Sequence, residues 1–174
     1  MCISDWVLGG MGFIEETGAA QHYRDARITP IYEGTNGVQA ADLVGRKFDM
    51  DGGSVLAALL SDIRVGAEGL DALTELVDAC EAVAGRYRDA KIDDRLAGSY
   101  PFLTMLSVAV CGWLMSRQLV AAQVAEGDVA FLEMKKASAR FYLEQVVPEA
   151  IGLKAAAMAP AEALYSLGAE AFAA

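Results

Sequence analysis

The sequence predicts an all-α protein, for three reasons. Apolar residues recur at alternating steps of three and four over a long stretch of the 174-residue chain, which is the period of a helix that buries one face. All four prolines stand where an all-helical chain would begin or end a helix. They are Pro30, Pro101, Pro148 and Pro160. No run of useful length alternates between apolar and polar residues, as a half-buried strand would.

The segment before the first clear helix is stiffened by a proline. Pro30 fixes its own φ and pushes Thr29 toward extended geometry, so residues 29–32 are expected to be strand-like or irregular. Glu33 follows directly, between this segment and the helix. A carboxylate near a helix N-terminus often serves only to stabilise the helix start, and that interpretation of Glu33 stays open at this point.

A helix is predicted to start just after this carboxylate and to run to about Phe48. Gly34 frees the backbone at the turn, and Thr35 or Asn36 can cap the first helical turn. Asn36 with Gln39 approximates a capping box. The unpaired N–H groups at such a helix start favour a phosphate, pyrophosphate or enolate oxygen.

A single long helix is predicted from Ser54, which can cap it, to Tyr87. Its apolar or small residues form one stripe over about nine turns, as in a bundle or a coiled coil. The stripe consists of Leu56, Leu59, Ile63, Gly66, Leu70, Leu73, Val77, Cys80, Ala84 and Tyr87. Gly66 and Gly69 weaken the middle of this helix, so a kink is expected there.

An apolar segment from Ser99 to Met115 predicts the next helix, with Pro101 in its first turn. The segment is interrupted and shorter than a bilayer requires. A central buried helix or a dimer-interface helix is therefore favoured over a membrane span. Gly112 and Trp113 indicate close helix packing within it.

The remainder of the chain is predicted to form shorter helices. Residues 126–128 end the apolar helix and cap another, which Pro148 then breaks. Short helices over residues 149–158 and 161–167, with Pro160 at the boundary between them, complete the all-helical prediction.

Composition argues against several classes of protein. A net charge of −10, with no basic cluster to offset it, disfavours nucleic-acid binding. His22 is the only histidine, so neither a histidine-based triad nor a metal site is expected, and a surface or capping role is favoured. Cys2, Cys80 and Cys111 form no C-x-x-C pair, and the last two fall on apolar helix faces, which predicts reduced core thiols. The N-terminus lacks a charged-then-apolar signal pattern, so a cytoplasmic location is expected.

Two parts of the sequence resemble one family. The first comprises Gly9–Phe13, Tyr23–Arg27, the sequence Tyr-Glu-Gly-Thr at residues 32–35, and Asp42–Lys47. It resembles the C-terminal part of the acyl-CoA dehydrogenase flavoenzymes over residues 6 to 48. Further along, residues 100–113 and 139–148 resemble the long helical C-terminal extension of a bacterial subclass, the 3-methylmercaptopropionyl-CoA dehydrogenase-like enzymes.

The resemblance implies that Glu33 is a catalytic base. In the family, the matching carboxylate removes the α-proton of an acyl-CoA thioester while the β-hydrogen leaves as hydride to FAD, and its backbone N–H helps to polarise the thioester oxygen. Thr35 corresponds to a threonine that contacts the flavin. Gly10 corresponds to a glycine whose backbone approaches FAD bound mainly by a neighbouring subunit, although it can equally be a helix C-cap with positive φ. Trp6 departs from the pattern, because relatives usually have a glutamine there.

The resemblance also implies an organisation. Residues 1–50 would be the end of the acyl-CoA dehydrogenase C-terminal helical domain, and residues 51–174 a helical bundle extension. Arg24 and Arg27 are expected to form structural ion pairs. A homo-oligomer, an acyl-CoA substrate and an electron-transfer flavoprotein as acceptor are implied, and this chain alone is expected not to turn over. The alternative is a non-catalytic helical oligomerisation or interaction module, or a truncated remnant.

Overall fold

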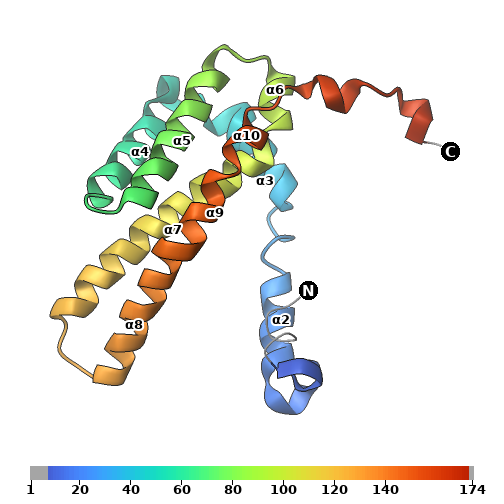
Figure 1. Ribbon diagram of the computed structural model, residues 1–174. Coiled ribbons are helices and arrows are strands. Elements are labelled where there is room, and N and C mark those ends of the chain that lie inside the picture. Colours follow the sequence, from blue (N-terminus) through green and yellow to red (C-terminus); the bar gives the residue numbers. More distant parts are fainter. Residues whose placement is uncertain (1–7, 173–174) are drawn as a thin grey trace. The chain divides into compact units, whose positions relative to one another are not determined.

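The computed structural model describes residues 8–172, which form helices and turns and contain no β-strand (Figure 1). The all-α prediction is therefore confirmed. The chain divides into two compact units, one ending at Gln39 and the other beginning at Ala40. The domain boundary predicted at residue 50 rests on the family resemblance of the two segments that it separates. The contacts within the structure do not test it, so it stays a prediction. Cys2 and Trp6 lie outside the described residues.

The first unit contains short helical segments around one α-helix. The 3₁₀ helices η1 (Gly9–Gly12) and η2 (Glu15–Thr17) precede α2 (Ala19–Arg27), and a series of turns then leads to α3 (Asn36–Asp42), where the unit ends. His22 is exposed on α2, which agrees with the expected surface role.

An ion pair joins α2 to the segment before it. Arg24 donates to both carboxylate oxygens of Glu15, at 2.6 and 2.8 Å, and the guanidinium lowers the pKa of this carboxyl group below its ordinary value. The structural ion pairing predicted for Arg24 is thus confirmed. Arg27 makes no ion pair with any carboxylate of the described residues.

The second unit is a bundle of α-helices, together with short 3₁₀ helices and π-helical turns. The α-helices are α4 (Ser54–Gly66), α5 (Asp71–Asp89), α6 (Ile92–Ala97), α7 (Ser99–Val124), α8 (Val129–Phe141), α9 (Val147–Ile151) and α10 (Lys154–Ala157). The wide π-helical turns are η3 (Leu43–Lys47) and η5 (Tyr142–Val146), and the 3₁₀ helices are η4 (Met50–Gly53), η6 (Ala161–Tyr165) and η7 (Ala169–Phe172).

The predicted continuous helix over residues 54–87 is wrong, because the segment forms two helices. α4 ends at Gly66 and α5 begins at Asp71, and the two lie side by side in opposite directions (Figure 1). Gly69, in the turn between them, has a φ of +77°, which glycine adopts without strain. The predicted stripe does face the core, but the glycines reverse the chain rather than kink one helix.

Tyr87 of α5 lies at the centre of the second unit. Its ring packs edge-on against Phe48 and Phe102, with ring centroids 6.0 and 5.2 Å apart. Its hydroxyl donates to the carbonyl of Ala157 at 2.9 Å. Gly98, which precedes α7, lies against this hydrogen bond, and a Cβ atom there would overlap both the Tyr87 hydroxyl and the Ala157 carbonyl. α5, α7 and α10 therefore meet where only glycine fits.

Close helix packing around Gly112 and Trp113 is confirmed. Gly112 is buried, and an added Cβ would lie 3.0 Å from a methyl group of Leu73 and 3.2 Å from one of Val147. The Trp113 ring covers Gly66 so closely that a Cβ there would overlap it. Small residues thus allow α4, α5 and α9 to approach α7.

α7 is longer than its predicted apolar segment. It runs for 26 residues, because no glycine or proline lies between Met115 and Gly127, so the prediction that this element is too short for a bilayer is wrong. Its most apolar window has a mean hydropathy of 1.4, and 33% of that window is buried. One such helix is a weak indication of a membrane span, since the core helix of a globular protein has the same properties. α7 packs against α4, α5 and α8.

The helix after α7 begins as predicted but continues further. The side chain of Asp128 accepts a hydrogen bond from the Phe131 amide at 3.0 Å, which confirms the predicted cap. The prediction that Pro148 ends this helix is wrong, because Val147 keeps helical dihedrals (φ −59°, ψ −46°) and α9 runs through the proline. The wide turn η5 just before it accommodates the missing amide and the proline ring.

The two described cysteines differ in environment. Cys80 is fully buried on α5, which confirms its predicted core position, and both thiols are free. The prediction for Cys111 is wrong, because its side chain is exposed. α7 is apolar on nearly all sides, so its sequence period does not reveal which face is covered.

We expect Tyr87→Phe to lower stability and to weaken its alkaline pH dependence. The Ala157 carbonyl loses a buried donor, which costs about 1–2 kcal/mol at pH 8. Burial raises the pKa of Tyr87 from 10.0 to about 12, so its contribution to stability is complete below pH 10 and is lost as the pH rises toward 12. Burial also raises the pKa of Cys80 and of Tyr142 to about 12, so the variant retains part of the slope. Urea unfolding between pH 8 and pH 12 measures both effects, and an unchanged alkaline slope would contradict the assignment.

Candidate active site

Residues 28–35 connect α2 to α3 through consecutive turns. The amides of Ile31 and Tyr32 both donate to the carbonyl of Ile28, at 3.0 and 3.1 Å, and the Asn36 amide donates to Pro30 at 3.3 Å. Of the two predicted geometries for this segment, the irregular one is confirmed and the strand-like one is wrong. The hydrogen bonds curl the chain back, so it enters α3 from a turn.

Glu33 occupies the last turn before α3 with a strained backbone. Its φ is +55°, a left-handed conformation that costs a residue with a Cβ roughly 1 kcal/mol, and Gly34 follows with a φ of +97°. The side-chain amide of Gln39 donates to the Glu33 carbonyl at 2.6 Å and holds this conformation. The carboxylate itself is exposed. Strain of this kind is concentrated at functional sites, which supports Glu33 as a functional residue.

Thr35 caps α3. Its hydroxyl oxygen accepts a hydrogen bond from the Val38 amide at 3.4 Å, so of the two predicted caps Thr35 is the correct one. The capping box predicted for Asn36 and Gln39 is wrong, because the Gln39 side chain binds the Glu33 carbonyl instead. Sequence reasoning therefore recognised Gln39 but missed that it fixes the candidate base.

Gly10 belongs to a different part of the first unit. It lies within η1, where its carbonyl accepts a hydrogen bond from the Phe13 amide at 3.2 Å. The interpretation of Gly10 as a C-cap with positive φ is wrong, because the left-handed residue is Gly9, with a φ of +57°. A Cβ at Gly10 would meet no atom of residues 8–172 within 4 Å, so packing against these residues does not require a glycine there.

The three candidate residues differ in what they offer a ligand. Glu33 presents an exposed carboxylate, and Thr35, two residues further along, presents an exposed hydroxyl whose proton is free to donate. Among the described residues, no atom lies within 4 Å of the position that a Cβ of Gly10 would occupy, so Gly10 forms no cradle with them. The described residues leave Glu33 exposed, so they do not supply the dry surroundings that a base for a carbon-bound proton needs. Within residues 8–172, no group of three His, Cys, Asp or Glu side chains is placed to hold a metal ion.

Two family models match this chain, one over each of its main parts. Residues 63–168 match the family described as acetyl-CoA dehydrogenase C-terminal like. Residues 6–47, which include the Glu33 turn, match the acyl-CoA dehydrogenase C-terminal domain. The chain therefore belongs to the acyl-CoA dehydrogenase family and carries sequence of its C-terminal domains.

Individual relatives are full-length enzymes of this kind. The chain is 40% identical to the 3-methylmercaptopropionyl-CoA dehydrogenase of Ruegeria pomeroyi, over 81% of this chain and 27% of that protein. It is 31% identical to the broad-specificity linear acyl-CoA dehydrogenase FadE5 of Mycobacterium tuberculosis, over 81% of this chain and 27% of that protein. It is 33% identical to a butyryl-CoA dehydrogenase of Syntrophomonas wolfei, over 90% and 29%. The chain thus spans less than a third of the length of these relatives.

Proposed function

We propose that this chain contributes the catalytic base to an FAD-dependent acyl-CoA dehydrogenase, and that Glu33 is that base. The observation that carries the proposal is the strained turn that presents Glu33, within a segment that matches the family's C-terminal domain. A helix-start carboxylate with no further role would not need a left-handed backbone, which is costly for glutamate. The chain shares less than a third of its relatives' length, so the proposal concerns the complete enzyme.

The residues of this turn have distinct tasks in the proposed reaction. The Glu33 carboxylate accepts the α-proton of the acyl-CoA thioester, while its amide N–H helps to stabilise the negative charge that develops on the thioester oxygen. Gln39 fixes the peptide that carries both groups. Thr35 would contact the flavin, and Gly10 would leave room for a flavin held by another subunit. FAD, when bound, supplies the acceptor for the β-hydrogen that leaves as hydride.

The proposal that Glu33 is the base also implies a metabolic role and an assembly for the complete enzyme. The complete enzyme would act in fatty acid or related acyl-CoA metabolism in the cytoplasm and pass electrons to an electron-transfer flavoprotein. It would be a homo-oligomer in which the second unit packs on the catalytic body. Glu33 is exposed to solvent in the part of the chain that the structure describes, so we expect no turnover from this chain alone.

A helical interaction module is the second candidate function, and one feature of α8 favours it. Phe131, Met134 and Phe141 recur at helical spacing and are 53%, 52% and 63% exposed. An apolar stripe of this kind on a helix is typical of a surface that another polypeptide or another copy covers.

A chimera separates the two functions. In it, this chain replaces the matching 27% of the Ruegeria pomeroyi enzyme, and the purified chimera and the 174-residue chain are each mixed with acyl-CoA thioesters without oxygen. We expect flavin to be retained and its absorbance to be bleached by substrate only in the chimera. A chimera that retains flavin but is not bleached, together with stable self-association of the 174-residue chain in light scattering, would favour the helical module.

A further inference from the structure

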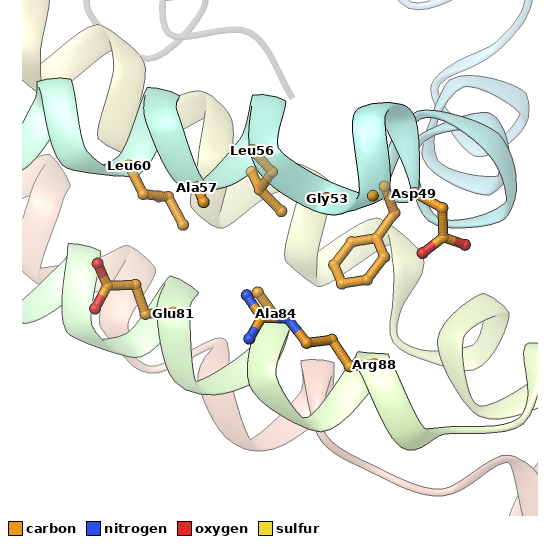
Figure 2. A pocket seen from close by; sticks show the side chains of 10 residues that line it. Asp49, Gly53, Leu56, Ala57, Leu60, Glu81, Ala84 and Arg88 are labelled. Carbon is orange, nitrogen blue, oxygen red and sulfur yellow. The ribbon is translucent and has the colours of Figure 1, made fainter.

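A cavity of about 320 Å³ lies between α4 and α5, within the second unit (Figure 2). Its walls combine apolar side chains, from Phe48, Leu56, Leu60 and Ala84, with charged side chains that provide at least as much of the lining. This volume is at the lower end of the range for small-molecule sites. The cavity is lined wholly by residues of the second unit, between residues 48 and 88.

Arg88 supplies the free charge of this cavity. Its side chain runs along the cavity from α5, and its guanidinium lies between Leu56 on one wall and Ala84 on the other (Figure 2). Among the described residues, no carboxylate forms an ion pair with it. A guanidinium presents several N–H donors in a fixed plane, which match the two oxygens of a carboxylate.

Two carboxylates also line the cavity, but both already have arginine partners. Asp49 accepts from Arg95 at 2.9 Å, and Glu81 accepts from Arg64 at 2.9 Å. Arg64 is also held by a second carboxylate, Asp78, at 2.6 Å. Figure 2 places Asp49 and Glu81 toward opposite ends of the cavity. Of the charged groups that line the cavity, Arg88 is therefore the one that has no ion-pair partner among the described residues.

We propose that this cavity binds a short-chain aliphatic carboxylate, with Arg88 pairing to the carboxylate group and the alkyl chain lying on Leu56, Leu60 and Phe48. The apolar side chains of Phe48, Leu56 and Leu60 favour an alkyl chain over a fully polar anion. The two neighbouring acidic residues and the net charge of −10 repel a doubly charged group more than a singly charged one, which disfavours phosphate. The proposal does not depend on the function of Glu33.

The test is a titration of the ¹⁵N-labelled 174-residue chain with sodium hexanoate, followed by amide NMR shifts at constant ionic strength. Hexanamide, which lacks the charge, and inorganic phosphate, which lacks the alkyl chain, are the comparison probes. We expect saturable shifts at Gly53, Ala84 and Arg88 with a Kd on the order of 1 mM for hexanoate. Hexanamide and phosphate are each expected to bind at least about fivefold more weakly.

Three variants locate the site. Arg88→Gln should weaken hexanoate binding about fivefold, because it removes the cation and leaves a shorter, neutral polar side chain. Ala57→Leu, on the exposed rim of the same cavity, should abolish binding by filling it. Arg140→Gln removes an exposed arginine of α8 outside this cavity and should leave the Kd unchanged. Absence of saturation with hexanoate, an unchanged Kd in folded Arg88→Gln, or tighter binding of phosphate would each overturn the proposal.

Discussion

Gly98→Ala is expected to destabilise the second unit by about 3 kcal/mol. The added methyl group would overlap the Tyr87 hydroxyl and the Ala157 carbonyl, so either the backbone of α10 moves or the buried hydrogen bond between them is broken. Overpacking of a core costs about 1–3 kcal/mol, and an unsatisfied buried acceptor adds to that cost. The midpoint of thermal unfolding should fall by about 10 °C, and calorimetry measures it.

Gly85→Ala is the matched control for Gly98→Ala. Gly85 lies inside α5, its φ is not left-handed, and a Cβ there would meet nothing within 4 Å. The same substitution should therefore stabilise the protein by about 0.5–1 kcal/mol, because alanine favours a helix more than glycine does. Gly98 has a φ of −91°, which alanine also adopts. Lack of space alone therefore explains why Gly98→Ala is expected to lower the stability while Gly85→Ala raises it. Equal effects at the two glycines would contradict the proposed packing of α7 on α10.

The sequence predicted that these segments are helical, but it did not predict where the chain reverses direction between them. The spacing of the stripe over residues 54–87 continues in phase through Gly66 and Gly69, so one long helix and two antiparallel helices would show the same pattern. Burial along the stripe was therefore predictable, whereas the reversal depends on contacts such as Trp113 over Gly66. Pro148 is the opposite case. Local rules predict that a proline ends a helix, but the wide π-helical turn before Pro148 allows the helix to continue.

The candidate site was found through its residue pattern rather than its geometry. The Tyr-Glu-Gly-Thr sequence located Glu33, and Gly34 indicated a turn, but a left-handed glutamate is not predicted by any local preference. Its conformation depends on the Gln39 side chain, which reaches back six residues to the Glu33 carbonyl. The exposure of Cys111 was unpredictable for a related reason, since a helix that is apolar on nearly all sides does not specify its covered face.

Glu33→Gln in the chimera is expected to slow the bleaching of flavin by acyl-CoA by roughly 10³-fold, since a positioned general base contributes about 10²–10⁴-fold. Glutamine retains the size and hydrogen bonding of the side chain but does not accept the proton. The positive φ costs glutamine about as much as glutamate, and the Gln39 contact is to the backbone, so the fold should be unaffected. Single-turnover kinetics without oxygen should show a slower chemical step with little change in acyl-CoA affinity.

Two further variants distinguish a catalytic role of the Glu33 carboxylate from a general effect of negative charge in the first unit. Glu33→Asp keeps a carboxylate but withdraws it by one methylene, and a displacement of this size should cost about 10²-fold. Glu16→Gln removes another exposed carboxylate of the first unit, within η2 and outside the Glu33 turn, and should leave the rate unchanged. Bleaching by Glu33→Gln within about threefold of the parent chimera would show that Glu33 is not the base. In that case the strained turn would require a structural explanation, and Gln39→Leu would test it through the melting temperature.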